Sequence, residues 1–299
     1  HQANRGGWPE HPIYIYKLAD SLNRPVAAMA SGQDHAFIAE HNAKELLRTW
    51  VVTAYTHGQA FTPPTNLWCY TKEKGTHWYK GTQEDYAWLY RFVRDNAVLF
   101  DDYDAVAPVA VVYDNAARRA GKANIEPVCA ALEKANIPFA IVAAGDDWLD
   151  YRLTPEILAP YETLLAAEPP EQMDTEQRAL LENSGRMQIF DEALLEQLPQ
   201  ITIENNREVA AVLRVKASDP KAPVVCHVHS RVYDPEQDHV APQENVVLHI
   251  PRLLLPERTY ENATILTPGN AQQTISVESS DTEILLRLPK VGLWHVITL

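Results

Sequence analysis

Near its beginning the chain has the hydrophobic pattern of a strand followed by a helix. Residues 25–30 form a short apolar run without charge, which is typical of a strand buried on both faces. Polar residues 31–35 interrupt this run and are expected to form a loop. Apolar residues then recur at three- and four-residue spacing across 43–54, which predicts a helix with one buried face. Asn42 and Glu45 have the spacing of a capping box at its start.

A second short strand is predicted directly after this helix. Residues 59–62 resume an extended pattern, and Pro63 and Pro64 end it. Two strands joined by a helix favour a parallel pair in a crossover unit. The loops that follow both strands then lie at the same edge, where parallel α/β proteins place their sites.

The middle of the chain alternates strands with helices. Strands are expected at 109–113, 139–143, 161–165 and 187–190, and helices at 125–135 and 174–182. This alternation predicts a parallel sheet with helices on both faces, in a flavodoxin- or amidotransferase-like, Rossmann-like arrangement. A further strand over 209–215 could close its edge. The acidic stretch 101–104 precedes this domain and is taken as the first domain boundary.

From residue 223 the helical period disappears, and short strands separated by turn residues take its place. Their spacing predicts a small antiparallel β-sandwich. The whole chain is therefore expected to be an α/β protein of three domains, over 1–104, 105–222 and 223–299.

Charge and cysteine content exclude several classes of function. The formal net charge of −14 disfavours nucleic acid as a partner, and no apolar run approaches the length needed to span a membrane. Cys69, Cys129 and Cys226 lie far apart, which argues against a disulfide framework or a thiolate metal site and leaves the compartment open. The chain starts at His1 with polar, Gly/Pro-rich residues, so we expect it to be the C-terminal part of a longer protein.

The expected α/β domain lacks the motifs of a cofactor enzyme. No G-x-G-x-x-G follows its first strand, so no dinucleotide cofactor is expected. The loop 144–148 lies at the usual ligand edge but could equally form a domain interface. His227 and His229 share one face of a strand and could present two imidazoles to a metal. No third ligand is evident nearby, so we expect a solvent-facing pair and no metal site.

The loops of the first domain combine aromatic and polar side chains. The residues concerned are Gln33, Asp34 and His35, then Thr62, Asn66, Trp68 and Tyr70, and then His77, Trp78 and Tyr79. Aromatic faces pack on the apolar face of a pyranose, and polar side chains bond its hydroxyls, so this mixture is typical of a sugar site. The alternative is that the aromatic residues only pack beneath the second domain. Asp34 is the best candidate acid, but it could instead cap the following helix.

Part of the chain resembles a known enzyme family. The sequences Leu-Leu-Arg-Thr-Trp at 46–50 and Ala-Tyr-Thr-His-Gly at 54–58, with the strand that follows, are similar to the end of a family 42-type glycoside hydrolase barrel. The later order also resembles β-galactosidases, with a trimerisation-like α/β domain and then a β-sandwich. This resemblance implies that residues 1–104 hold the last strands of a TIM barrel. It also implies that the earlier strands, including one with an acid/base Glu, precede residue 1.

The resemblance implies hydrolysis of a glycosidic bond, but one expected residue is missing. In that family a nucleophilic Glu follows the seventh barrel strand, whereas this chain has Asp34 there, with Glu40 further along. Either Asp34 replaces the Glu, or the nucleophile lies upstream, or catalysis is degenerate. We expect these 299 residues alone to be inactive and to supply sugar contacts through Gln33, His57, Trp68 and Trp78, with Asp34 as the catalytic candidate.

Two rival hypotheses remain. The chain could be a non-catalytic carbohydrate-binding or assembly protein that forms a homo-oligomer through its α/β domain. It could also be a small-molecule-binding α/β protein unrelated to sugars, which a deep pocket at the 115–144 edge would favour.

Overall fold

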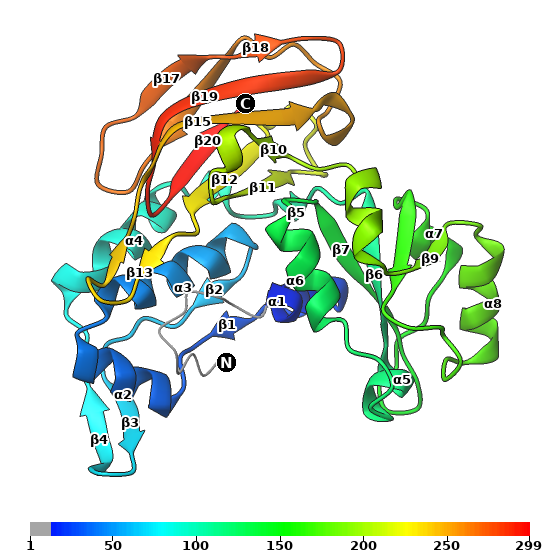
Figure 1. Cartoon of the computed structure of the whole chain (residues 1–299), viewed down its shortest axis with the longest axis horizontal. Helices are drawn as coiled ribbons and strands as arrows, with labels where there is room; N and C mark the ends of the chain where they lie inside the picture. Colours follow the sequence, from blue (N-terminus) through cyan, green and yellow to red (C-terminus); the bar gives the residue numbers. More distant parts are fainter. Residues whose placement is uncertain (1–12) are drawn as a thin grey trace.

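The computed structural model describes residues 13–299, in which three groups of secondary structure surround a central junction (Figure 1). The polar residues 1–10 lie outside the described part. The elements of the first group are α1 (Ile13–Ser21), β1 (Ala27–Ala28), α2 (Gly32–His41), α3 (Lys44–Thr56), β2 (Ala60–Phe61), β3 (Leu67–Thr71), β4 (Gly75–Tyr79), α4 (Gln83–Asp95) and a 3₁₀ turn, η1 (Ala97–Leu99).

The first two strands are parallel neighbours, as the sequence predicted. Ala27 pairs with Ala60 and Ala28 with Phe61. Helix α3 connects them and buries the apolar face seen in the sequence, including Leu46 and Trp50. The carboxyl ends of β1 and β2 lead directly into α2 and into the β3–β4 segment.

Three local expectations in this region were wrong. Residues 31–35 were expected to form a loop, but Gly32–His41 form helix α2, because Ser31 and Asp34 make a capping box at its start. Asn42 ends α2 in a left-handed conformation and does not cap α3. Residues 68–79 were expected to be a loop but form most of an antiparallel hairpin, β3–β4, which projects away from the rest of the molecule at the lower left of Figure 1.

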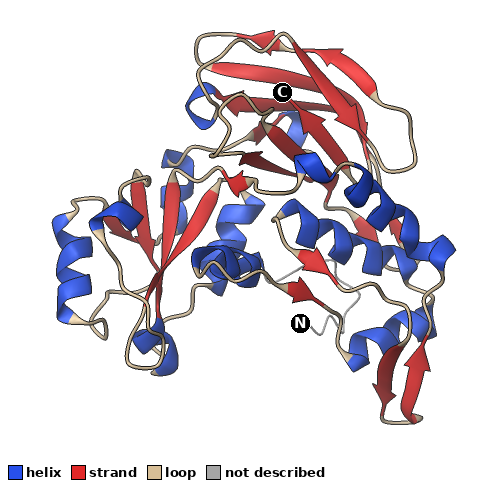
Figure 2. Ribbon diagram, turned by 180° about the vertical axis from the view of Figure 1, so that it is seen from behind, coloured by secondary structure: helices blue, strands red, loops and turns tan. Residues whose placement is uncertain are grey.

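The second group is built on a parallel sheet from the four strands that the sequence predicted. Its elements are β6 (Val109–Asp114), α5 (Asn115–Arg119), α6 (Glu126–Lys134), β7 (Phe139–Ala144), α7 (Pro155–Leu158), β8 (Thr163–Ala166), α8 (Thr175–Asn183), β9 (Met187–Ile189) and the turn η2 (Glu192–Gln197). The strand order is β7-β6-β8-β9. Helices cover both faces, with α1 and α6 on the side of the first group (Figures 1 and 2).

The third group consists of two antiparallel sheets that share one apolar core. One sheet has the order β10-β15-β19-β18, and the other has the order β17-β16-β20-β12-β11-β5. Their elements are β5 (Asp104–Ala105), β10 (Thr202–Ile203), η3 (Glu204–Asn206), β11 (Val209–Val215), β12 (Val225–Ser230), β15 (Gln243–Pro251), η4 (Arg252–Leu254), β16 (Asn262–Leu266), β17 (Gln273–Ser276), β18 (Glu278–Ser279), β19 (Glu283–Val291) and β20 (His295–Thr298). A separate hairpin, β13 (Tyr233–Asp234) and β14 (His239–Val240), reaches down to α3.

Two expectations about this group were also wrong. Strand β11 does not close the parallel sheet, because it pairs antiparallel with β12 and with β5. His227 does not face solvent: its imidazole is fully buried against the rings of Phe100 and Trp294. Trp294 also contacts Tyr55 and Phe92, so this aromatic cluster joins the third group to the first.

Within residues 13–299, no cluster of three or more His, Cys, Asp or Glu side chains is arranged to hold a metal ion. The same residues include no helix with the length and apolar character needed to cross a membrane. The three cysteines are buried and free.

Candidate functional site

An exposed aromatic surface lies on the outward face of the β3–β4 hairpin. Trp68 and Trp78 stand directly opposite each other across the two strands, and Tyr70 follows Trp68 on the same face. Trp68 is 48% exposed, Tyr70 43% and Trp78 59%. The rings of Trp68 and Tyr70 are stacked, with centroids 6.1 Å apart. We call these three residues the hairpin aromatic face.

The opposite face of the hairpin anchors it to the body of the protein. Cys69 and Tyr79 are buried there, and the Tyr79 ring stacks on the His35 imidazole of α2 at 5.8 Å. The Tyr79 hydroxyl also makes a 2.6 Å hydrogen bond with the hydroxyl of Tyr86. Burial lowers the pKa of His35, which favours its neutral form. The aromatic face is therefore presented by an anchored element.

The hairpin aromatic face borders the beginning of α2. The Trp68 ring lies over Gly32, so that an ideal Cβ at Gly32 would stand 1.9 Å from Trp68 Cζ3. Gln33 is exposed beside this contact. The structure therefore brings together Trp68, Trp78 and the first turn of α2, which carries Gln33 and Asp34.

Asp34 has a clear structural role in this position. Its carboxylate accepts a 2.8 Å hydrogen bond from the Ser31 amide, and the Ser31 hydroxyl accepts one from the Asp34 amide at 3.1 Å. The residue is only 1% exposed. Asp34 thus belongs to the capping box of its own helix, α2, rather than capping the helix predicted at 43–54. A catalytic role for Asp34 stays a prediction.

His57 is separated from these residues. It follows the C-terminal end of α3 and precedes β2, at the opposite end of that strand from the hairpin. Its imidazole is 4% exposed and stacks on Tyr16. Burial, assisted by the nearby Lys17 and Arg214 charges, holds its pKa well below the usual range. The structure does not bring His57 together with the predicted sugar contacts.

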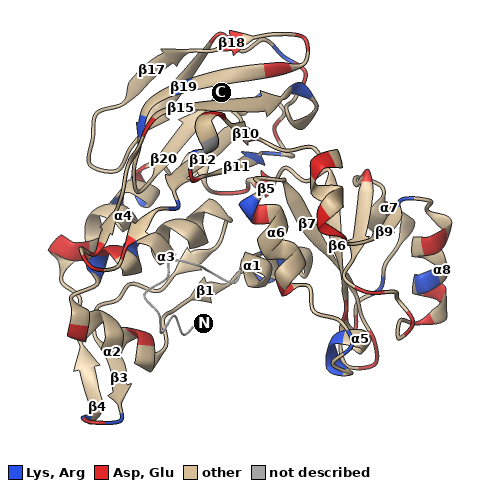
Figure 3. Ribbon diagram, in the orientation of Figure 1, with Lys and Arg blue, Asp and Glu red and all other residues tan. Residues whose placement is uncertain are grey.

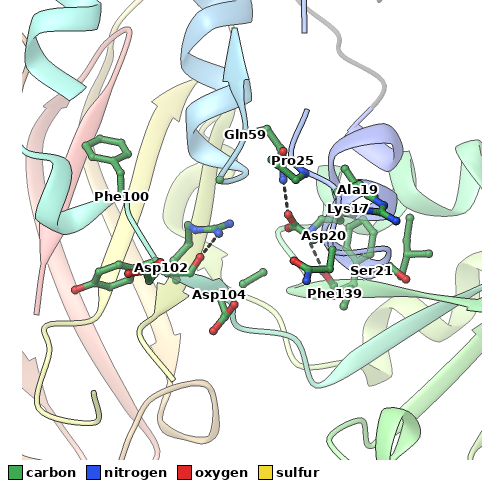
Figure 4. Close-up of a pocket in the computed structure, with 18 of the residues that line it drawn as sticks. Lys17, Ala19, Asp20, Ser21, Pro25, Gln59, Phe100, Asp102, Asp104 and Phe139 are labelled. Atoms are coloured by element: carbon green, nitrogen blue, oxygen red, sulfur yellow. Dashed lines mark hydrogen bonds between the residues drawn. The ribbon is translucent and has the colours of Figure 1, made fainter. Parts of the chain in front are cut away.

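A cavity of about 440 Å³ lies at the junction of the three groups (Figure 4). Its lining includes Lys17, Asp20, Gln59, Phe139 and Arg214. The Lys17 ammonium donates a 2.6 Å hydrogen bond to the Phe139 carbonyl, and the Gln59 amide donates to the Asp20 carboxylate. Burial lowers the pKa of Lys17 to about 8 and also lowers that of Arg214.

The position of this cavity argues for a structural role. Gln59 precedes β2 and Phe139 begins β7, so the cavity lies at the amino ends of both parallel pairs. Ligands of parallel sheets bind at the carboxyl ends of the strands. The cavity is also not at the 115–144 edge that the small-molecule hypothesis requires.

Two contributors to the site were missed in the sequence. Gly32 is needed beneath the Trp68 ring, and no local pattern indicates a contact with a residue 36 positions away. Helix α2, by contrast, had a readable signal, because Ser31 and Asp34 have the S-x-x-D spacing of a capping box.

Comparison with known proteins finds that this chain is similar in sequence to two alpha-agarases. No family model matches the chain. An alpha-agarase from Thalassotalea agarivorans is 27% identical over 266 residues, which cover 84% of this chain and 18% of that protein. An alpha-agarase from Alteromonas agarilytica is 26% identical over 307 residues, covering 97% of this chain and 21% of that protein. The chain thus spans about one fifth of the length of these relatives.

A solved structure with a similar fold is alpha-L-fucosidase isoenzyme 2 from Paenibacillus thiaminolyticus. The TM-score is 0.56 at 10% sequence identity, over 98% of this chain and 63% of the fucosidase chain. At this identity the likeness concerns the fold alone. The named relatives are glycoside hydrolases, which agrees with the predicted class, but they do not point to family 42 specifically.

Proposed function

We propose that this chain is part of a glycoside hydrolase that acts on agar-type galactan, and that its hairpin aromatic face binds the sugar chain. The agarase relatives support the substrate class. In this proposal β1 and β2 are the last two strands of a TIM barrel. Their parallel pairing supports that position, since the sites of such barrels lie at the carboxyl ends of the strands.

The observation that carries the proposal is the exposure of Trp68, Tyr70 and Trp78 on one face of an anchored hairpin. Soluble proteins rarely leave several large aromatic side chains in solvent together unless the surface binds something. Flat, amphipathic rings suit the apolar faces of pyranose sugars. Charged residues of the hairpin are confined to its tip, at Lys72, Glu73 and Lys74, so the aromatic face itself matches a neutral glycan (Figure 3).

Hydrolysis by this mechanism requires two carboxylates, one on each side of the scissile bond. Asp34 lies at the carboxyl end of β1, in the position of the proposed barrel rim, but its carboxylate is engaged by the helix cap. We therefore assign Asp34 a positioning role: it holds the first turn of α2, which carries Gln33 and the Gly32 that Trp68 lies over. The nucleophile and the acid/base residue would then lie elsewhere in the complete enzyme.

Affinity electrophoresis tests this proposal directly. The purified chain is run in native gels with and without soluble agarose, beside the variants Trp78→Ala and Val98→Ala. Val98 is an exposed apolar residue, 77% exposed against 59% for Trp78, and it lies on η1, away from the hairpin, so it serves as the control. Agarose should retard the wild type and Val98→Ala, whereas Trp78→Ala should bind about tenfold more weakly. Equal mobility of all three proteins with and without agarose contradicts the proposal.

The second candidate function is a non-catalytic one, in which the chain binds carbohydrate or assembles into an oligomer through its α/β group. The capped and buried carboxylate of Asp34 favours it over direct catalysis by this segment. Agar-oligosaccharide hydrolysis by the complete enzyme, with loss of activity on removal of residues 13–299, would reject it.

A further inference from the structure

One exposed aromatic residue lies outside the hairpin aromatic face and has no role in the proposal above. Trp148 follows β7, in the loop 144–148 that the sequence placed at the ligand edge of the parallel sheet. Its side chain is 79% exposed. Because β6 and β7 are parallel neighbours, the residues after both strands, including Asn115, meet at this edge.

The loop holds the Trp148 ring in a defined orientation. The Arg119 guanidinium lies 4.7 Å from the ring centroid and forms a 2.6 Å ion pair with Asp146. The Asp146 carboxylate also accepts hydrogen bonds from the Trp148 amide at 2.9 Å and from the Asn115 side chain at 2.8 Å.

The backbone of this loop is fixed as well. A Cβ at Gly145 would stand 2.1 Å from the Leu149 carbonyl oxygen, so only glycine fits there. With Arg119 against one side of the ring, the other side of Trp148 faces solvent. A ring that is already ordered loses little conformational freedom when a ligand binds, which favours its use as a binding platform.

The surroundings of Trp148 match a sugar better than a protein. Charged side chains lie beside it: the Arg119 guanidinium contacts the ring, and the exposed Asp147 directly precedes Trp148 in the chain. A protein interface needs a contiguous apolar core of several residues. A sugar ring needs one aromatic platform with a hydrogen-bonding group beside it, and Trp148 and the exposed Asp147 provide these.

We propose that Trp148 is a second sugar-binding platform, built by the α/β group and separate from the hairpin aromatic face. A neutral pyranose would stack on its open side, with Arg119 supporting the opposite face of the ring and the exposed Asp147 accepting hydrogen bonds from sugar hydroxyls. That the sugar comes from an agar-type galactan rests on the proposed function. Two platforms on one protein would raise its affinity for a long polysaccharide more than for a short oligosaccharide.

Titration of the tryptophan indole N–H signals by NMR tests this inference. Agarohexaose is the probe, and maltohexaose is the matched control sugar. The Trp148 signal, assigned through Trp148→Phe, should shift saturably with agarohexaose both in the wild type and in Trp78→Ala. Trp148→Ala should leave the Trp78 response intact and weaken binding to agarose polymer about tenfold.

The outcomes separate this inference from the proposed function. If Trp78 responds to agarohexaose and Trp148 does not, the second platform is rejected while the hairpin proposal stands. If neither signal moves, both are rejected. A Trp148 shift that follows protein concentration without sugar would identify the surface as a contact between copies of the chain and would also overturn the inference.

Discussion

The Trp68 ring lies directly over Gly32, at a distance that leaves no room for a side chain on residue 32. This contact joins the hairpin aromatic face to the beginning of α2, and it places an exposed tryptophan beside the carboxyl end of β1. The orientation of Trp68 therefore depends on the absence of a Cβ atom in a different element of the fold.

Gly32→Ala should weaken agarose binding several-fold while lowering the free energy of unfolding only slightly. The new methyl group would displace the Trp68 ring, and because that ring is half exposed it can move outward without disrupting a core. We expect a loss of about 1 kcal/mol in unfolding free energy and several-fold weaker retention by agarose. Gly292→Ala is the control, since a Cβ there meets no atom within 4 Å. Unchanged retention in Gly32→Ala would show that the Trp68 orientation is irrelevant to binding.

Asp34→Ala should lower stability through loss of the capping box. Removing the carboxylate leaves the partly buried Ser31 amide without its acceptor, at an expected cost of about 1 kcal/mol in urea unfolding. Asp174→Ala provides a comparison, because Asp174 is the N-cap residue of α8, where its carboxylate also accepts backbone hydrogen bonds but far from the hairpin. In the complete enzyme, Asp34→Asn would abolish hydrolysis without loss of stability if Asp34 were the nucleophile. We expect partial activity, as suits a positioning residue.

Asp238 caps helix α3 from a distant hairpin. Its carboxylate accepts hydrogen bonds from the amides of Glu45 and Leu46 at 2.8 and 3.0 Å, and from the Tyr233 hydroxyl at 2.8 Å. Asp238→Ala should therefore destabilise the protein by about 1–2 kcal/mol, measured by thermal or urea unfolding. Glu236→Ala, an exposed substitution in the same turn, should have little effect. If both variants are as stable as the wild type, the contact between this hairpin and α3 contributes nothing to stability, and this prediction is wrong.

Buried histidines should make the protein sensitive to acid. Burial and the nearby Arg214 charge lower the pKa of His227 to about 3, and burial lowers that of His229 to about 4. Both imidazoles are neutral when folded but bind protons near pH 6.5 when unfolded. Stability is thus fully present above about pH 6.5 and is lost as the pH falls toward these lower values.

His227→Phe tests this pH dependence. Both ring nitrogens of His227 are buried and lack a hydrogen-bond partner among the described residues. Phenylalanine keeps the contacts with Phe100 and Trp294, so we expect stability within about 1 kcal/mol of the wild type at pH 7. Unfolding followed by circular dichroism should show a lower acid midpoint than in the wild type. His239→Phe, at an exposed site, is the control. An unchanged acid midpoint in His227→Phe, or one equal to that of His239→Phe, would contradict the role of His227 in the acid sensitivity.

Patterns within a short stretch predicted much of this fold. The apolar runs gave β1, β2 and the four strands of the parallel sheet, because buried parallel strands are hydrophobic along their whole length. Helix α2 was missed although Ser31 and Asp34 signalled it. The β3–β4 hairpin was missed because aromatic residues lie on both of its faces, which hides the alternation of a strand.

Features that depend on distant parts of the chain could not be predicted. Asn42 appeared to cap α3, but the cap comes from Asp238, 193 residues beyond Glu45. His227 is buried because Phe100 and Trp294 pack against it, and neither is near it in the sequence. For the candidate site, composition identified Trp68 and Trp78 as sugar contacts to be tested. It could not reveal that they oppose each other across two strands.

A crystal structure of the chain with agarohexaose tests the central claim most directly. The account predicts a pyranose ring packed on Trp78 and Trp68 at the outward face of the hairpin, within van der Waals contact of both indoles and beside Gln33. Agarohexaose bound in the junction cavity lined by Lys17 and Arg214, without contacting the hairpin tryptophans, would contradict the hairpin sugar site.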